Sequence, residues 1–343
     1  MKIVVRGTNW VGDAVMTIPA LRALRKAFPA AEISLLTRSW ADAIFRDADF
    51  IDRLLTFDAS GSKRRDLVSQ RRLLKDERFD LAVLFTNSFE SALAVSLARI
   101  PRRIGYAKEG RGILLTDATA IPDWKNERHE VNYYLNLVIE AAMRLGVEIA
   151  DPETSISIPV SDERRREAIE IMTRAGIDRS RPVVVLGAGS TNSNAKRWPA
   201  ERYARLADLL AERRGAQVVL LGTTDETDVS RAVIEKVVSA PVDLAGRTTL
   251  AQAVAILSEV DAVVSNDMGL AHIAPAVGAA TLVIFGPTND RTTRPVGAEM
   301  IRKPFDCAPC MLRECPIDHR CMTSIEPEEV FERISQLLAI KGK

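Results

Sequence analysis

Short apolar runs rich in β-branched residues alternate along the chain with longer stretches whose apolar positions recur every three or four residues. The short runs are typical of buried parallel strands, and the longer stretches of amphipathic helices. In the first half of the chain the pattern predicts strands at residues 2–5, 33–36, 54–57 and 81–85. It also predicts a helix at residues 13–28, which Pro29 ends, and another at residues 129–145.

The same alternation starts again in the second half of the chain. It predicts strands at residues 183–186, 218–221, 262–264 and 281–285. Helices are expected to begin near Pro199, Asp225, Leu250 and Gly269, with a last helix at residues 326–338. Two series of strand–helix units predict an α/β protein with two Rossmann-like, doubly wound parallel sheets. The boundary is expected near residues 178–182, which gives domains 1–178 and 179–343, and ligands are expected at the carboxyl ends of the strands, in a cleft between the domains.

Composition narrows the classes of function. The 343 residues suffice for two domains, and 47 Lys and Arg against 46 Asp and Glu give no case for nucleic acid as a partner. The apolar runs are far shorter than the roughly 20 residues that a membrane span needs, and no secretory hydrophobic segment follows Met1. We therefore expect a cytoplasmic protein whose contact with a membrane is peripheral.

The first strand is followed by Gly7-Thr8-Asn9-Trp10-Val11-Gly12-Asp13. This turn nearly matches a phosphate-binding P-loop, but Asp13 stands where the loop needs a lysine, so the nucleotide-hydrolase interpretation fails. A carboxylate at the start of a helix is either an N-terminal cap or a functional acid or base. The spacing leaves both open, and the flanking glycines, which allow close approach of a substrate, add weight to function.

Three strand ends in the second domain carry polar groups and glycines. The first reads Gly187-Ala188-Gly189-Ser190-Thr191-Asn192 and leads to Lys196-Arg197-Trp198-Pro199, which predicts a phosphate cradle with Lys196 as counter-charge. Asn192 replaces the third glycine of a dinucleotide fingerprint, which disfavours a dehydrogenase. At the second strand end Asp225 and Glu226 are ribose-binding or helix-capping acids. The third reads Asn266-Asp267-Met268-Gly269-Leu270-Ala271-His272, where helix amides would face an anion.

All four cysteines lie in residues 307–321, and this usage is typical of a reducing compartment. Their number, with His319 nearby, suffices for a tetrahedral zinc site, but the spacing is not that of a zinc ribbon. A structural metal at Cys307, Cys310, Cys315 and Cys321 and a set of reduced thiols therefore both remain open.

The order and spacing of five blocks along nearly the whole chain resemble the heptosyltransferases of glycosyltransferase family 9, and most closely those that add the second heptose. The blocks are residues 9–16, residues 196–199, residues 266–272, Phe285-Gly286-Pro287-Thr288 and the cysteine segment 307–321. The resemblance implies a GT-B fold and an inverting transfer from ADP-L-glycero-β-D-manno-heptose to heptosyl-Kdo2-lipid A, without a required cofactor or catalytic metal. Whether magnesium assists the departure of ADP stays open.

Carried over by position, the resemblance makes Asp13 the general base, beside Gly12, and Lys196 the group that stabilises departing ADP. Asp225 or Glu226 would bind ribose, and Asp267 the sugar hydroxyls. The other implied donor-binding residues are Ser190, Thr191, Arg247, Thr248, Met268, Gly269 and His272.

Lys63-Arg64-Arg65 lies in the domain that should face the acceptor. A solvated basic helix face is the default interpretation of such a run. We hypothesise contact with acceptor phosphates or Kdo carboxylates, on the cytoplasmic face of the inner membrane. The alternatives are the first heptosyltransferase or another GT-B transferase, a nucleotide-sugar epimerase on the same fold, and a non-catalytic binding protein.

Overall fold

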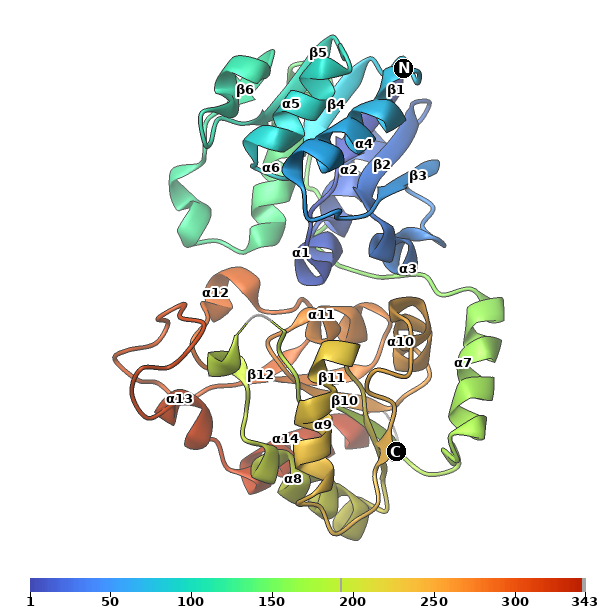
Figure 1. The fold of residues 1–343 in the computed structure, drawn as a ribbon, viewed down its shortest axis with the longest axis vertical. Helices are drawn as coiled ribbons and strands as arrows, with labels where there is room; N and C mark the ends of the chain where they lie inside the picture. Colours follow the sequence, from blue (N-terminus) through green and yellow to red (C-terminus); the bar gives the residue numbers. More distant parts are fainter. Residues whose placement is uncertain (192, 341–343) are drawn as a thin grey trace. The chain divides into compact units, whose positions relative to one another are not determined.

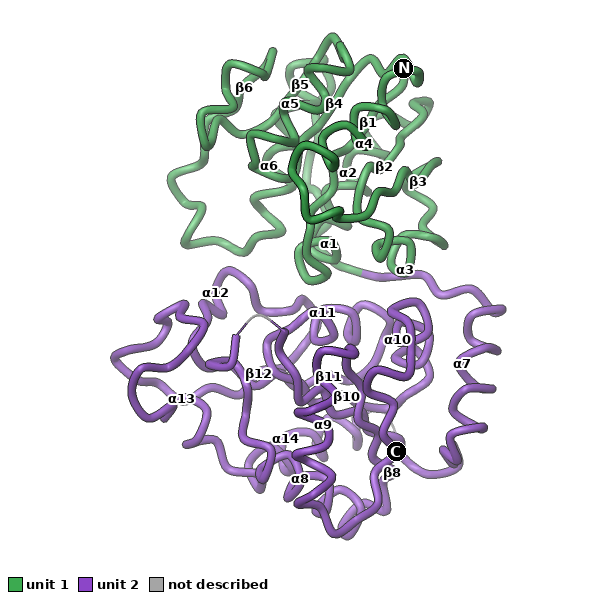
Figure 2. The backbone as a smooth tube through the Cα atoms, viewed as in Figure 1, with its two compact units in different colours: residues 1–156 green, residues 157–343 purple. Residues whose placement is uncertain are grey.

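The computed structural model describes residues 1–191 and 193–340 and divides into two compact units, Met1–Ile156 and Ser157–Lys343 (Figure 2). The sequence placed the boundary later, near residues 178–182. The difference is helix α7 (Asp162–Arg174), which belongs to the second unit because it packs against α10 (Leu250–Leu257). Arg165 Nη1 lies 2.8 Å from Glu259 Oε1, and Arg164 Nη2 donates to the Ala251 carbonyl at 3.2 Å. The predicted domain ranges are corrected accordingly.

The first unit is built on one six-stranded sheet in the order β3-β2-β1-β4-β5-β6, with every pairing parallel. Its strands are β1 (Lys2–Arg6), β2 (Glu32–Arg38), β3 (Arg53–Phe57), β4 (Leu81–Leu84), β5 (Arg102–Tyr106) and β6 (Asp117–Thr119). The four predicted strands are confirmed, whereas β5 and β6 were not predicted. In β5 the sequence Arg-Arg-Ile-Gly-Tyr has too few apolar residues to show a buried strand.

Helices cover both faces of this sheet (Figure 1). Helix α2 (Ile18–Ala27) packs against α6 (Glu130–Met143), and α4 (Lys63–Lys75) packs against α5 (Phe89–Leu97). The predicted helix at 13–28 is two helices, because α1 (Val11–Met16) ends at Thr17 before α2 begins. Pro19 has no N–H to continue the helical hydrogen bonds, so the helix is interrupted at Thr17. The remaining elements are η1 (Ser39–Ala41), α3 (Asp42–Phe45), η2 (Arg111–Leu114) and η3 (Asp123–Asn126).

The second unit repeats this topology with the order β12-β11-β10-β7-β8-β9, again all parallel. Its strands are β7 (Val183–Gly187), β8 (Gln217–Leu220), β9 (Val242–Asp243), β10 (Ala262–Asn266), β11 (Ala280–Ile284) and β12 (Glu299–Ile301). Both sheets therefore reverse their strand order beside the first strand, between β1 and β4 and between β7 and β10. In open parallel sheets ligands bind outside the carboxyl ends of the strands at such a reversal.

One face of the second sheet packs on α8 (Ala200–Arg214) and α14 (Pro327–Ile340). Inward residues of alternating strand positions, such as Val184, Leu186 and Val264, join Leu206 and Ile334 in this core. The remaining elements are η4 (Asn194–Lys196), η5 (Thr224–Glu226), α9 (Thr227–Ile234), α11 (Gly269–Ala276), α12 (Asp290–Thr293) and α13 (Arg320–Thr323). No helix in the described part of the chain is both long enough and apolar enough to span a membrane.

Candidate functional site

Asn266, at the carboxyl end of β10, ties together the loops at the strand reversal of the second unit. Its side chain is fully buried. The amide Nδ2 donates to the carbonyls of Ala188 at 2.8 Å and Gly189 at 3.0 Å, and Oδ1 accepts from Trp198 N at 3.1 Å and Tyr203 Oη at 3.0 Å. These four bonds use the whole hydrogen-bonding capacity of the amide. Asn266 was not among the predicted site residues, although the sequence block 266–272 that contains it had been singled out.

Lys196 and Asp267 form the charged centre of this region. Lys196 Nζ lies 2.8 Å from Asp267 Oδ2 and donates to the Asp267 carbonyl at 3.3 Å. Thr288 Oγ1 donates to the same Asp267 Oδ2 at 2.8 Å. The Asp267 side chain is 7% exposed and that of Lys196 is 27% exposed. The pair thus presents an ammonium group to solvent while its carboxylate is buried. Thr288 was missed as a site residue, although its block had been singled out.

Glu226 and Asp225, which the sequence could not tell apart, lie in different surroundings. Asp225 is exposed, whereas Glu226 is 1% exposed and faces the turn after β7. Glu226 Oε2 accepts from Thr223 N at 2.9 Å and Thr223 Oγ1 at 3.1 Å, and Oε1 accepts from Thr191 Oγ1 at 3.4 Å. A side chain on Gly189 would overlap the Glu226 carboxyl group. The carboxylate that belongs to the strand-end site is therefore Glu226.

The other predicted residues of the second unit lie in the same strand-end loops. Ser190 is buried, Thr191 is exposed, and Asn192 lies outside the described residues. The loop that carries Arg247 and Thr248 is tied to the loop after β8, because Gly246 N donates to the Gly222 carbonyl at 3.0 Å. Of the remaining predicted residues, Met268 is the N-cap of α11, Gly269 begins that helix, and His272 is buried within it.

Asp13 lies at the third position of α1, in the first turn of the helix. The N-cap residue is Trp10, which makes no side-chain cap, so Asp13 is not the N-cap residue of α1. The carboxylate still lies at the positive end of the helix dipole. Burial and, after it, the negative charge of Asp13 raise the pKa of the Tyr134 hydroxyl of α6 well above its ordinary value. Asp13 therefore lies within electrostatic reach of a buried phenol. Gly12 precedes it in the same turn.

Lys63, Arg64 and Arg65 form the first turn of α4, and all three are exposed. Among these three side chains, only that of Arg65 makes a hydrogen bond within the described residues, from Nη2 to the Ser60 carbonyl at 3.3 Å. Their contact with an acceptor remains a prediction.

The cysteine segment 307–321 supports the turn that carries Lys196. Ala195 N donates to the Arg313 carbonyl at 3.0 Å, and His319 Nε2 lies 2.7 Å from the Ala195 carbonyl. Met311 N donates to the Pro287 carbonyl at 2.8 Å, beside Thr288. The segment thus holds the turns before Lys196 and before Thr288.

None of the four cysteines forms a disulfide. They differ in exposure: Cys307 is exposed, Cys310 and Cys315 are half-buried, and Cys321 is buried. Burial, followed by the neighbouring thiols, raises the pKa of Cys321. Across residues 1–191 and 193–340, no three His, Cys, Asp or Glu side chains are arranged to hold a metal ion. A structural metal at these cysteines and a set of reduced thiols both stay predictions.

Comparison with known proteins identifies the relatives of this chain. The family model described as glycosyltransferase family 9 (heptosyltransferase) matches residues 67–320. The chain is 29% identical to lipopolysaccharide heptosyltransferase 2 of Salmonella typhimurium, covering 100% of both chains. It is 29% identical to lipooligosaccharide heptosyltransferase 2 of Haemophilus ducreyi, over 99% of this chain and 100% of the relative. Its fold matches E. coli ADP-heptose LPS heptosyltransferase II with a TM-score of 0.82, at 27% identity over 100% of both chains.

Proposed function

Because the chain belongs to glycosyltransferase family 9, we propose that it transfers L-glycero-D-manno-heptose from ADP-heptose to heptosyl-Kdo2-lipid A in the inner core of lipopolysaccharide. The observation that carries the proposal is the Lys196–Asp267 pair at the carboxyl end of β10, in a unit that also buries Glu226 at a strand end. An ammonium group suits a diphosphate, and carboxylates can accept hydrogen bonds from the hydroxyl groups of ribose and the sugar. The relatives named above, all heptosyltransferases 2, support this acceptor over the one used by a first heptosyltransferase.

The donor residues have separate roles in this proposal. Lys196 balances the diphosphate and the charge that develops on departing ADP. Glu226 accepts hydrogen bonds from ribose, and Asp267 from the heptose hydroxyls. The remaining donor contacts come from the turn of Ser190 and Thr191, from Arg247 and Thr248 beside adenine, and from the α11 start with Met268, Gly269 and His272.

Asp13 acts as the general base. Its carboxylate takes the proton of the acceptor hydroxyl as that oxygen bonds to the anomeric carbon of the heptose. The bond from the same carbon to the diphosphate breaks, and ADP leaves with the electron pair. Attack opposite the leaving group inverts the anomeric configuration.

Lys196 supplies counter-charge to ADP from the protein itself, so we propose that no catalytic metal is required. Magnesium that binds ADP in solution would change the rate only modestly. On the acceptor side, Lys63, Arg64 and Arg65 are proposed to face the phosphates or Kdo carboxylates of the glycolipid. The acceptor is a lipid, so contact with the cytoplasmic face of the inner membrane would be peripheral.

The test incubates the purified protein with ADP-heptose and heptosyl-Kdo2-lipid A and measures ADP release and the mass of the acceptor. One added heptose and stoichiometric ADP are expected, and Asp13→Ala should lower kcat by ~10²–10⁴-fold. Transfer to Kdo2-lipid A without heptose would assign the chain to the first heptosyltransferases instead. Addition of EDTA should leave most of the rate, and its complete loss would contradict the metal-free mechanism.

A further inference from the structure

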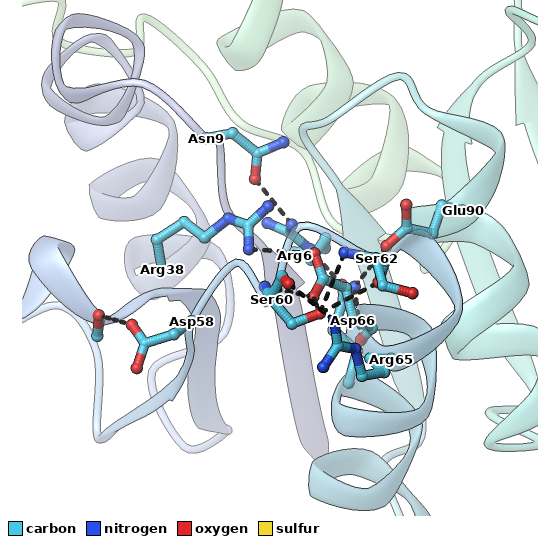
Figure 3. Close-up of polar contacts among 11 residues, drawn as sticks. Arg6, Asn9, Arg38, Asp58, Ser60, Ser62, Arg65, Asp66 and Glu90 are labelled. Carbon is cyan, nitrogen blue, oxygen red and sulfur yellow. Dashed lines mark hydrogen bonds and ion pairs between the residues drawn. The ribbon is translucent and has the colours of Figure 1, made fainter.

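Two arginines lie side by side where β1 and β2 end (Figure 3). Arg6 is the last residue of β1 and Arg38 the last of β2. Both guanidinium groups stack on the ring of Phe57, with Cζ 4.9 Å from its centroid for Arg6 and 4.6 Å for Arg38. Arg6 is 3% exposed, and the Arg38 side chain is 19% exposed. Two positive charges are thus held together at the carboxyl edge of the sheet.

The hydrogen-bond partners of Arg6 are all uncharged. Nε donates to Gln70 Oε1 at 2.9 Å, Nη2 donates to Asn9 Oδ1 at 2.9 Å, and Nη1 donates to the Gly7 carbonyl. Within the described part of the chain, no carboxylate forms an ion pair with Arg6. Burial and then the charge of Arg38 lower the pKa of Arg6 to about 9, so the group is still a cation at neutral pH. A buried cation without an ion pair is costly in a folded protein.

The acidic groups around the two arginines neutralise Arg38 only in part. Asp66 Oδ1 accepts from Ser60 N at 2.8 Å and Ser60 Oγ at 2.6 Å, and Asp66 Oδ2 forms a long ion pair with Arg38 Nη1 at 3.7 Å. That Nη1 atom is buried and makes no hydrogen bond. Glu90, the other acid beside Arg6, accepts from Gln70 Nε2 at 3.1 Å. Among the described residues, Arg38 therefore has one long ion pair, and no carboxylate binds its guanidinium group through two parallel hydrogen bonds.

The remaining charged groups in this view are Arg65, which adds positive charge, and Asp58, which accepts from Ser39. Asn9 projects from the loop that leads from β1 into α1, and that helix carries Asp13 four residues later. The arginine pair therefore lies at the strand ends where ligands bind in open parallel sheets, next to the loop of the proposed base.

We infer that Arg38, with the buried Arg6 behind it, binds an anionic group of the acceptor, a carboxylate or a phosphate, and so fixes the acceptor beside the loop of Asp13. A guanidinium matches either anion with two parallel hydrogen bonds. Arg6 is a positioning residue, which raises the positive potential and holds Asn9. The inference rests on the proposed function, and it differs from the Lys63–Arg65 hypothesis because those three side chains are solvated.

The first experiment is steady-state kinetics of Arg38→Gln with heptosyl-Kdo2-lipid A. The acceptor KM should rise about 10–100-fold, the effect of one lost charge-assisted bond, with the donor KM unchanged. Arg38→Lys should recover only part of this, because it keeps the charge and loses the fork. Lys75→Gln, an exposed residue at the other end of α4, is the matched control and should leave the acceptor KM unchanged. Circular dichroism melting checks that the variants fold.

The second experiment identifies the anion. Equilibrium binding to the wild type and to Arg38→Gln is measured without donor, using the intact acceptor, one lacking the lipid A phosphates and one with the Kdo carboxylates amidated. The wild type should bind one of the two modified acceptors more weakly than the intact acceptor. Arg38→Gln should bind that modified acceptor and the intact acceptor equally, and the group missing from it is then the anion that Arg38 binds. Equal affinity of Arg38→Gln and wild type for the intact acceptor would overturn the inference. It would also be overturned if each of the two acceptor modifications weakened binding to Arg38→Gln as much as binding to the wild type. Because binding needs no turnover, a failure of heptose transfer counts against the proposed function alone.

Discussion

Lys196 Nζ and Asp267 Oδ2 lie 2.8 Å apart, and the ammonium also donates to the backbone carbonyl of the same aspartate. An ammonium group has three donors, so Asp267 takes two and one is left for another acceptor. The ammonium is thus fixed to the residue that directly follows β10. Since a diphosphate needs a positive charge at a defined place, we expect donor binding to depend on this attachment.

Thr288 secures that attachment, because its hydroxyl donates to the oxygen that also binds Lys196. Thr288→Val removes this bond and leaves the shape nearly unchanged. We expect the donor KM to rise ~5–10-fold, the effect of one hydrogen bond to a charged group, while the acceptor KM stays constant. Thr288→Ser keeps the hydroxyl and should restore most of the affinity. If the serine and valine variants bind ADP equally weakly in calorimetry, the hydroxyl is not the cause.

Glu226 and Asp225 give a direct test of which acid reaches the ribose. Glu226→Gln keeps an oxygen that can accept from Thr223, but it weakens hydrogen bonds from ribose hydroxyls. We expect ADP affinity to fall about 10-fold, which corresponds to the loss of a charge-assisted bond. Asp225→Asn, on an exposed side chain, should bind ADP as the wild type does. The assignment is wrong if the two variants exchange these results in titration calorimetry.

Gly189 must lack a side chain because the Glu226 carboxyl group fills the adjacent space. Gly189→Ala should push Glu226 away from Thr223, costing ~1–3 kcal/mol of unfolding free energy together with ADP affinity. In a Glu226→Ala background the same substitution should cost less, since the obstacle is gone. Gly112→Ala is the matched control, because its nearest neighbour would be at an ordinary 3.7 Å. Additive losses in the double variant, measured by urea unfolding, would refute the contact.

The fold could be predicted from hydropathy because parallel strands buried on both faces are continuous apolar runs. Strands such as β1 and β7 stand out for this reason, whereas β5 begins with two arginines and β9 has only two residues. The domain boundary could not be predicted in the same way. Helix α7 has an ordinary amphipathic pattern, and only its tertiary contacts with α10 show which unit it joins.

The site was partly predictable for a similar reason. Strand ends followed by glycines and polar residues marked the loops of Asp13, Lys196 and Asp267. Spacing could not show that Trp10 is the N-cap of α1, nor that Glu226 and not Asp225 is buried. Spacing also could not show that Arg6 belongs to a candidate binding site. In the sequence Arg6 is only the polar last residue of a strand, and the fold places Arg38 beside it.

The cysteine segment should act on donor binding through His319. Its Nε2 must carry the proton, because the partner is the Ala195 carbonyl one residue before Lys196. His319→Ala should lower kcat/KM for the donor ~3–10-fold, the effect of one neutral hydrogen bond, and leave the acceptor KM unchanged. His319→Gln offers an N–H of similar reach and should recover most of the loss. Were the glutamine variant as poor as alanine, the effect would come from packing of the segment instead.

Asp66 links the strand-end arginines to stability at acidic pH. Hydrogen bonds from the Ser60 hydroxyl and amide, together with the charge of Arg38, lower the pKa of Asp66 below its ordinary value of 3.8. Between the folded and the ordinary pKa the unfolded chain binds more protons, so this stabilisation is complete above pH ~4 and is lost as pH falls through the folded pKa. Asp66→Asn should therefore cost ~1–2 kcal/mol at pH 6 and progressively less towards pH 3. Urea unfolding followed by circular dichroism measures the difference, with Asp76→Asn, exposed at the end of α4, as the control. An Asp66→Asn deficit that is the same at pH 3 as at pH 6 would show that the ionised carboxylate is not the source of the stabilisation.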